Sequence, residues 1–149
     1  LTLSNYSHMK ILIYSYLLFL SFWSPKQGIE GFLREVKGNQ MGIEKKSSLK
    51  GQPLVGRLYI FNDLSDTDLV GLEGQWCKSV QQKPYLIIQT DNKGYFKQAL
   101  KKGKYVVLVE AYDGFFIPSF DQFNHPTKVL VESKKYTSLN ILVNSKAIY

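Results

Sequence analysis

The sequence predicts an all-β domain, an antiparallel β-sandwich of about seven strands. Three observations lead to this prediction. Short apolar runs recur along the chain, turn residues separate them at regular spacing, and no long amphipathic helical pattern occurs. The 149 residues, 44% of them hydrophobic, suffice for one domain with a sizeable core and are too few for two comfortable ones. We therefore expect a single domain over residues 28–149.

The expected strands begin after an apolar N-terminal run. The first, Gly28–Lys37, alternates apolar and charged residues imperfectly, as an edge strand with a bend does, and the Gly-, Lys- and Ser-rich residues 38–52 then predict a loop. In residues 62–83 no period of two is visible, but Ser65 followed three residues later by Asp68 predicts a capped helix of one or two turns. The other expected strands are Leu54–Phe61, Tyr85–Thr90, Tyr95–Leu100, Tyr105–Ala111, Lys128–Glu132 and Tyr136–Val143.

The stretch TDNKGYFKQALKKGKYVVLVEA, residues 90–111, combines two turns with three strand-like runs. Asp91–Gly94 predicts a tight reversal in which Gly94 takes a positive φ, and we expect the flanking strands to pair as a hairpin. The chain reverses again before Gly103. In the run that follows, Tyr105, Val107 and Val109 share one face while Val106, Leu108 and Glu110 share the other, which places the strand in the middle of a sheet. Together these features predict a three-stranded meander with Asp91, Gly94 and Gly103 as structural turn residues.

The N-terminal region has the composition of a signal peptide. From Met9 the chain reads MKILIYSYLLFLSFWSPKQG, with thirteen residues from Ile11 to Trp23 interrupted only by Ser and Tyr. This run is shorter than the roughly 20 apolar residues of a spanning helix. We assign residues 1–27 to upstream sequence and a signal peptide, with cleavage between Pro25 and Gly28. The protein is then periplasmic, displayed on the outer surface or secreted; a retained anchor or a buried N-terminal helix is the alternative.

Charge and cysteine usage narrow the classes of function. The formal net charge is +7, but the basic residues are scattered along the sequence and accompany no nucleic-acid-binding motif, which favours a solvated surface. Cys77 is the single cysteine, so neither an intramolecular disulfide nor a lipid-modified cysteine after the apolar run is expected. A catalytic pair with Cys77 as nucleophile and His125 as its base would need more than these two residue types, and no other residue in the sequence supports it. We expect no cofactor and no metal; a calcium ion at Asp63, Asp66 and Asp68 is the alternative.

The turn-containing stretch resembles a known family. Thr90-Asp91-x-x-Gly94-Tyr95-Phe96, followed by Leu100-x-x-Gly103-Lys104-Tyr105, is similar to the signature of carboxypeptidase regulatory-like domains, although Lys101 stands where that family often has proline. The resemblance implies a transthyretin-like, or prealbumin-like, β-sandwich in a small exported bacterial protein. It also implies that Gly94 and Gly103 hold turns and that Phe96, Tyr105, Val107 and Val109 fill the core.

The resemblance further implies a non-catalytic role. A related fold hosts 5-hydroxyisourate hydrolase, but that enzyme ends in Tyr-Arg-Gly-Ser, whereas this chain ends in Lys-Ala-Ile-Tyr. We therefore expect an exported module with a binding or structural role at the cell envelope, whose partner is a protein or a glycan and not a nucleic acid, and which has no stable membrane span after signal cleavage.

Aromatic residues provide the candidate contact surface. Trp76 lies in the long loop of residues 62–83, and Tyr112, Phe115 and Phe116 lie in a turn-rich region, where rings could stack on a sugar or pack against a protein. Core packing is the competing interpretation, especially for Phe115 and Phe116. The alternative functions are a carbohydrate-binding module and a small hydrolase in which His125 acts as general base with Asp113 or Asp121, although no nucleophile is apparent.

Overall fold

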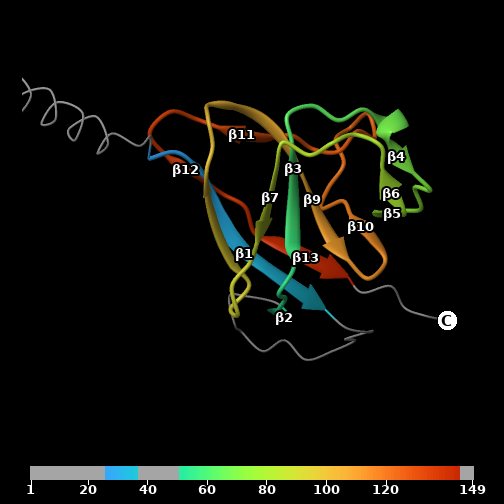
Figure 1. Cartoon of the computed structure of the whole chain (residues 1–149), viewed down its shortest axis with the longest axis horizontal. Coiled ribbons are helices and arrows are strands. Elements are labelled where there is room, and N and C mark those ends of the chain that lie inside the picture. The colour runs from blue at the N-terminus through green and yellow to red at the C-terminus, as the bar shows by residue number, and fades with distance from the viewer. Residues whose placement is uncertain (1–25, 37–50, 145–149) are drawn as a thin grey trace, which may run out of the picture.

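The structure is a computed structural model that describes residues 26–36 and 51–144. Strands dominate these residues, and the only helical segment among them is one 3-10 turn, so the predicted all-β class is confirmed. Two sheets pack face to face as in a β-sandwich, and a small two-stranded unit lies beside them (Figure 1). The assigned signal peptide, apart from residues 26 and 27, and most of the expected loop 38–52 fall outside the described residues.

The first sheet is built around β1 (Gly28–Val36). Along one side β1 pairs in parallel with β12 (Tyr136–Ser138) and β13 (Ile141–Asn144), and along the other it pairs antiparallel with β8 (Tyr95–Ala99) and β2 (Gln52–Pro53). The expectation that this strand lies at an edge is therefore wrong, and the sheet is mixed rather than purely antiparallel.

The inward face of β1 explains the error. Residues 29, 31, 33 and 35 are buried in alternation, but two of these four positions hold Gly31 and Glu35. A glycine and a carboxylate at inward positions hide the apolar period of two. Gly31 is required there because a Cβ would lie 1.9 Å from the carbonyl oxygen of Leu139.

The second sheet is built around β9 (Gly103–Ala111). This strand pairs with β3 (Arg57–Phe61) on one side and with β10 (Gly114–Phe116) and β11 (Val129–Val131) on the other, so its predicted central place is confirmed. β7 (Leu86–Gln89) extends the sheet beyond β3, and β5 (Trp76–Cys77) extends it beyond β10. The small separate unit consists of β4 (Leu69–Val70) and β6 (Ser79–Val80).

The turn at Asp91–Gly94 forms, but the predicted hairpin and meander are wrong. Gly94 has φ 75°, and Asp91 Oδ1 accepts the N–H groups of Lys93 at 2.8 Å and Tyr95 at 2.9 Å. The flanking strands nevertheless join different sheets, because β7 pairs with β3 and β8 pairs with β1. The turn carries the chain from one sheet to the other, and Gly94 C=O accepts the Leu33 N–H at 2.7 Å. Gly103 is the first residue of β9 and has an extended φ of 159°.

Two hydrophobic cores lie on opposite faces of the second sheet. The main core fills the space between the two sheets, and the outer core lies under residues 62–80 and 115–120. Along β9 the side chains alternate between the two cores as predicted. The buried members of the main core are Ile29, Leu33, Leu58, Ile60, Trp76, Phe96, Leu100, Tyr105, Val107, Val109, Phe116, Val131, Ile141 and Val143. Those of the outer core are Phe61, Leu64, Leu69, Cys77, Val106, Leu108 and Ile117.

The predicted helix in residues 62–83 is a single 3-10 turn, η1 (Asp66–Asp68). The Ser65 N–H donates to Asp68 Oδ2 at 2.9 Å, and the Asp68 N–H donates to the Ser65 carbonyl at 3.0 Å. The expected cap is therefore present and leads into β4. Within the described ranges, no helix has the length and apolar character needed to cross a bilayer.

Candidate functional site

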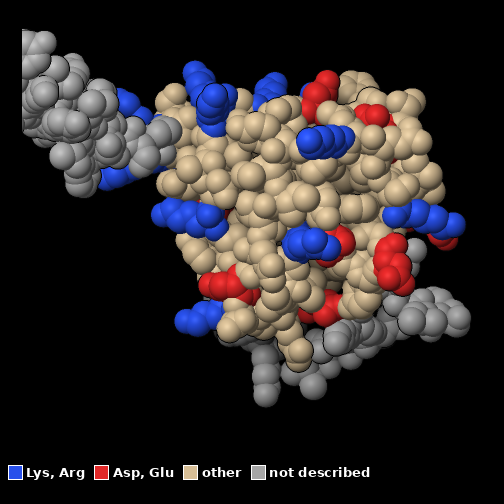
Figure 2. Space-filling model, in the orientation of Figure 1, with Lys and Arg blue, Asp and Glu red and all other residues tan. Residues whose placement is uncertain are grey.

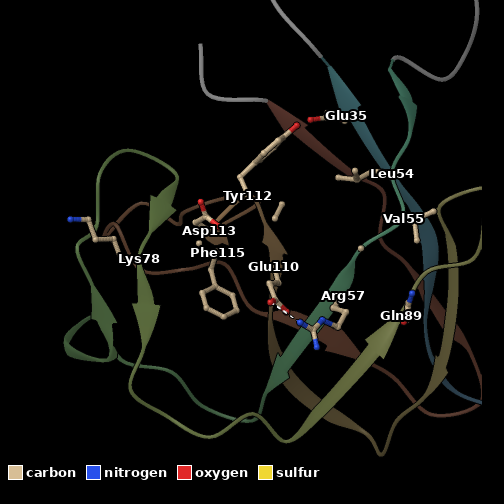
Figure 3. Close-up of a pocket in the computed structure, with 13 residues that line it drawn as sticks. Glu35, Leu54, Val55, Arg57, Lys78, Gln89, Glu110, Tyr112, Asp113 and Phe115 are labelled. Atoms are coloured by element: carbon tan, nitrogen blue, oxygen red, sulfur yellow. Dashed lines mark hydrogen bonds and ion pairs between the residues drawn. The ribbon is translucent and has the colours of Figure 1, made fainter. Parts of the chain in front are cut away.

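A groove of about 970 Å³ lies at one end of the sandwich, where β1 and β9 end and β3 begins. It is open to solvent, and its walls come from segments far apart in the sequence (Figure 3). Among the polar and aromatic side chains that line it are those of Glu35, Arg57, Glu110, Tyr112, Asp113 and Phe115.

One side of the groove is held by a hydrogen-bonded network. Arg57 and Glu110 are directly opposite in the pairing of β3 with β9, and Arg57 Nη2 lies 2.8 Å from Glu110 Oε1. The Tyr59 hydroxyl donates to Glu110 Oε2 at 2.6 Å. This hydrogen bond, together with burial, raises the pKa of Tyr59. Both carboxylate oxygens of Glu110 are thus engaged, and the half-exposed guanidinium of Arg57 is held at this wall by its contact with Glu110.

Tyr112 supplies an exposed aromatic ring. It occupies the turn between β9 and β10 with φ 52°, a left-handed conformation that is uncommon for a tyrosine. Its side chain is 56% exposed, and its ring centroid lies 6.0 Å from that of Trp76 in an edge-to-face arrangement. A buried aromatic neighbour limits the motion of the ring, so Tyr112 offers contact area at a low cost in side-chain entropy.

Glu35 faces Tyr112 from the opposite wall. Glu35 is only 7% exposed because it occupies an inward position of β1, and its Oε1 has no hydrogen-bond partner among the residues that the structure describes. In Figure 3 the carboxylate of Glu35 and the hydroxyl end of Tyr112 point toward one another. A buried acceptor without a donor raises the free energy of the folded state, and a donor on a bound partner would remove that cost.

The structure brings three of the four aromatic residues predicted for the contact surface together, Trp76, Tyr112 and Phe116, and only Tyr112 and Phe115 of the four line the groove. Trp76 and Phe116 are 9% and 1% exposed, and their rings pack at 5.2 Å in the main core, as the competing interpretation holds. Phe115 is partly buried and packs edge-on against Tyr59 at 4.9 Å. Tyr112 is therefore the principal exposed ring of the set.

Glu35, Arg57 and Glu110 are charged lining residues that were not predicted from the sequence. Glu35 could have been found from the sequence, because it lies on the same face of the strand as Ile29 and Leu33. A charged residue at such an inward position is unusual. Arg57 and Glu110 had none, since their pairing depends on the register of two strands that lie far apart in the chain.

The residues of the hydrolase alternative do not form one catalytic set. His125 Nδ1 lies 2.7 Å from Asp66 Oδ2, outside the groove, and this hydrogen bond raises the pKa of His125. Asp121 Oδ1 accepts the N–H groups of His125 at 3.0 Å and Phe123 at 2.8 Å; the first of these chiefly lowers the pKa of Asp121. Asp113 lines the groove.

The calcium and cysteine alternatives also lack an assembled site. Asp63 is 3.8 Å from Lys128 Nζ, Asp66 pairs with His125, and Asp68 caps η1. Across residues 26–36 and 51–144, no three His, Cys, Asp or Glu side chains gather in a metal-binding arrangement. Cys77 is 3% exposed, and burial raises the pKa of its thiol, the opposite of what a reactive thiolate needs.

Comparison of the chain with protein-family models, with curated proteins and with solved structures finds no match. The candidate site is therefore interpreted from its own geometry.

Proposed function

We propose that this protein is a non-catalytic, exported β-sandwich module that binds a protein or glycan of the cell envelope through the groove, with Tyr112 as the main contact. The observation that carries the proposal is the exposed Tyr112 ring, which lies in a left-handed turn and packs against Trp76. It faces a carboxylate oxygen of Glu35 that has no hydrogen-bond partner within residues 26–36 and 51–144. An aromatic ring beside fixed polar groups is a common arrangement in sites that bind sugars or peptides.

We also propose that the chain is a carboxypeptidase regulatory-like domain with a transthyretin-like sandwich. Two features support this assignment. The Asp91–Gly94 segment is a tight turn with a positive φ at Gly94, and the aromatic and apolar residues for which the resemblance implies a core role are buried. A non-catalytic role agrees with the separation of His125 from the groove and with the full engagement of Glu110.

The proposal is tested by affinity capture from cell-envelope extract with the immobilised chain, followed by identification of both bound proteins and bound glycans. We expect a ligand that Tyr112→Ala fails to capture. With the purified ligand, Tyr112→Ala should weaken binding by roughly tenfold or more, because truncation of a central aromatic contact costs on the order of 1–2 kcal/mol.

Phe123→Ala is the matched control, because Phe123 is 68% exposed and does not line the groove. It should bind the ligand as the parent does. Equal binding by Tyr112→Ala and the parent would refute the groove as the contact surface, and a glycan ligand would favour the carbohydrate-binding alternative over a protein partner.

A further inference from the structure

Lysines that are scattered in the sequence gather at one end of the folded domain, opposite the groove. We call this surface the basic end and define it by six exposed residues: Lys26, Lys101, Lys102, Lys104, Lys134 and Lys135. Figure 2 shows several basic side chains along the upper left of the molecule, near the point where the described chain begins; basic and acidic side chains are mixed over the rest of this face.

Backbone contacts bring the three segments of the basic end together. Gln27 C=O accepts the Leu100 N–H at 3.2 Å, and Gln27 Oε1 accepts the Lys134 N–H at 3.3 Å. The start of β1 therefore lies between the β8–β9 turn and the β11–β12 turn. Lys104 stands opposite Leu130 in the pairing of β9 with β11. These contacts fix the lysines on one rigid surface.

The basic end is poorly neutralised. Only Lys135 of the six is in an ion pair within the described residues, with Glu132 at 2.6 Å, and Glu30 farther along β1 is paired with Lys97. Six lysines against one glutamate give this end a net charge of +5. The other described residues comprise seven basic and ten acidic side chains, a net charge of −3. The excess positive charge of the described domain therefore lies at the basic end.

The two nine-residue strands β1 and β9 both run from the basic end to the groove. At roughly 3.3 Å per residue they separate the two surfaces by about 25–30 Å. The chain enters at Lys26, three residues after the apolar run Ile11–Trp23. In the uncleaved chain the basic end is thus the end of the domain nearest to any membrane into which that run inserts.

We propose that the basic end docks on an anionic lipid bilayer and thereby holds the groove away from the membrane. Each lysine close to an anionic surface adds attraction, and five of the six have no ion pair within the described residues. Leu130 lies among these lysines and is 47% exposed, so the surface also offers an apolar side chain to the headgroup region. The negative remainder of the domain is repelled by the same bilayer, which favours this orientation.

A bilayer fits these features better than a nucleic acid does. An aromatic platform interleaved with the lysines would be expected for single strands, and a helix or ribbon entering a groove would be expected for duplex DNA. The basic end instead combines turns, lysines and an exposed leucine beside the site where the apolar segment joins the domain. The rings nearest to it are engaged within the domain, since Tyr105 packs against Tyr85 and Lys97 lies over the Tyr136 ring.

The test measures co-sedimentation of the full chain with vesicles of phosphatidylcholine alone and of phosphatidylcholine with about 30% phosphatidylglycerol. The ratio of the two partition coefficients is the readout, because the apolar run contributes to both. We expect a ratio of about ten or more for the parent at low salt, falling toward one at high salt. The variant Lys101→Gln/Lys102→Gln/Lys104→Gln/Lys134→Gln should have a ratio near one.

The matched control, Lys78→Gln/Lys83→Gln/Lys93→Gln/Lys128→Gln, removes the same charge from other surfaces and should keep the parent's ratio. Equal ratios for parent and test variant, or an equal loss in the control, would overturn the proposal. Displacement of the parent from vesicles by duplex DNA at equal phosphate concentration would also overturn it, because the basic end would then be a general polyanion site. Tyr112→Ala should keep the parent's ratio, so failure of the groove proposal is distinguishable from failure of this one.

Discussion

The main core and the outer core differ in how they are built, although they share the strands β3 and β9. The main core joins regular strands of two sheets, and each of its central residues is covered from both sides. The outer core packs one face of the second sheet against residues 62–80 and 115–120, where the strands are only two or three residues long. Short strands make few backbone hydrogen bonds, so the outer layer depends on side-chain packing and on turns.

Because the two cores differ in this way, we expect substitutions in the outer layer to leave the fold intact. The main core fixes the relation between the two sheets and therefore the ends of β1 and β9 that form the groove. The outer layer can open locally while the sandwich persists, because its removal uncovers one face of a sheet that stays paired on the other. We expect substitutions in the main core to act globally and those in the outer layer to act locally.

The largest expected effect is that of Leu58→Ala in the main core. Leu58 is fully buried on β3, and truncation leaves a cavity between sheets that cannot easily collapse, at a cost of about 3–4 kcal/mol in the free energy of unfolding. Urea denaturation measures this change. Val55→Ala is the control, since Val55 is 51% exposed and its truncation should cost less than about 0.5 kcal/mol. A cost below about 1 kcal/mol for Leu58→Ala would mean that the two sheets are not tightly packed.

Two glycines with positive φ lie in different parts of the domain, Gly94 in the turn between the two sheets and Gly74 in the outer layer. At Gly94, with φ 75°, an added Cβ would lie 2.2 Å from the Leu33 carbonyl oxygen, whereas at Gly74, with φ 59°, nothing lies within 4 Å. Gly74→Ala should therefore cost only the backbone strain, about 1 kcal/mol. Gly94→Ala should cost about 2–3 kcal/mol, because the turn between the sheets must also move. Similar losses in thermal unfolding for both variants would show that the inter-sheet turn yields easily.

Features that depend on neighbouring residues in the sequence were predicted more successfully than the pairing of strands. The strand runs, the central place of β9, the turn at Gly94 and the Ser65–Asp68 cap depend on local patterns. All four occur, although the strand expected at Tyr136–Val143 is divided into β12 and β13. The pairing of strands does not depend on local patterns. The same Asp-x-x-Gly turn suits a hairpin and a crossing between sheets, which is why β7 and β8 were wrongly expected to pair.

The functional surfaces were harder to predict for the same reason. The groove depends on the register that places Arg57 opposite Glu110, and the basic end depends on three turns that meet only in the folded chain. Tyr112 could be named from the sequence because it lies in a turn signal among aromatics. Its exposure, and the burial of Trp76 and Phe116, could not, since composition alone does not tell which ring of a cluster faces solvent.

A smaller effect is expected from Leu69→Ala, which should open the outer layer alone. Leu69 is 8% exposed, and its neighbours can relax, so we expect a loss of about 2 kcal/mol in local stability. Native-state hydrogen exchange should report this loss at the amides of Lys78 and Gln81, which donate to Val70 and Asp68 at 2.8 and 2.9 Å. Amides of β9 that bond to β3 should keep the parent's protection. Faster exchange in both places would mean that the two cores unfold as one unit.

The smallest expected effect is a pH dependence of the outer layer through His125. Its hydrogen bond to Asp66 raises the pKa of His125 in the folded state above the ordinary value of 6.5, and it joins η1 to the loop after Phe120. Asp121 and Lys128 also face His125, and their charges act in opposite directions. Because the folded state binds the proton more tightly, the stabilisation is complete below about pH 6.5 and is lost as the pH rises through the folded pKa of His125.

His125→Gln should therefore lower the thermal midpoint at about pH 5 and leave it nearly unchanged at about pH 8.5. Asp66→Asn should give the same pH profile, since either change removes the charged pair. A difference from the parent that is constant with pH would show instead that His125 acts through packing. The outer layer, like the apolar main core, would then gain no stability from a charged pair.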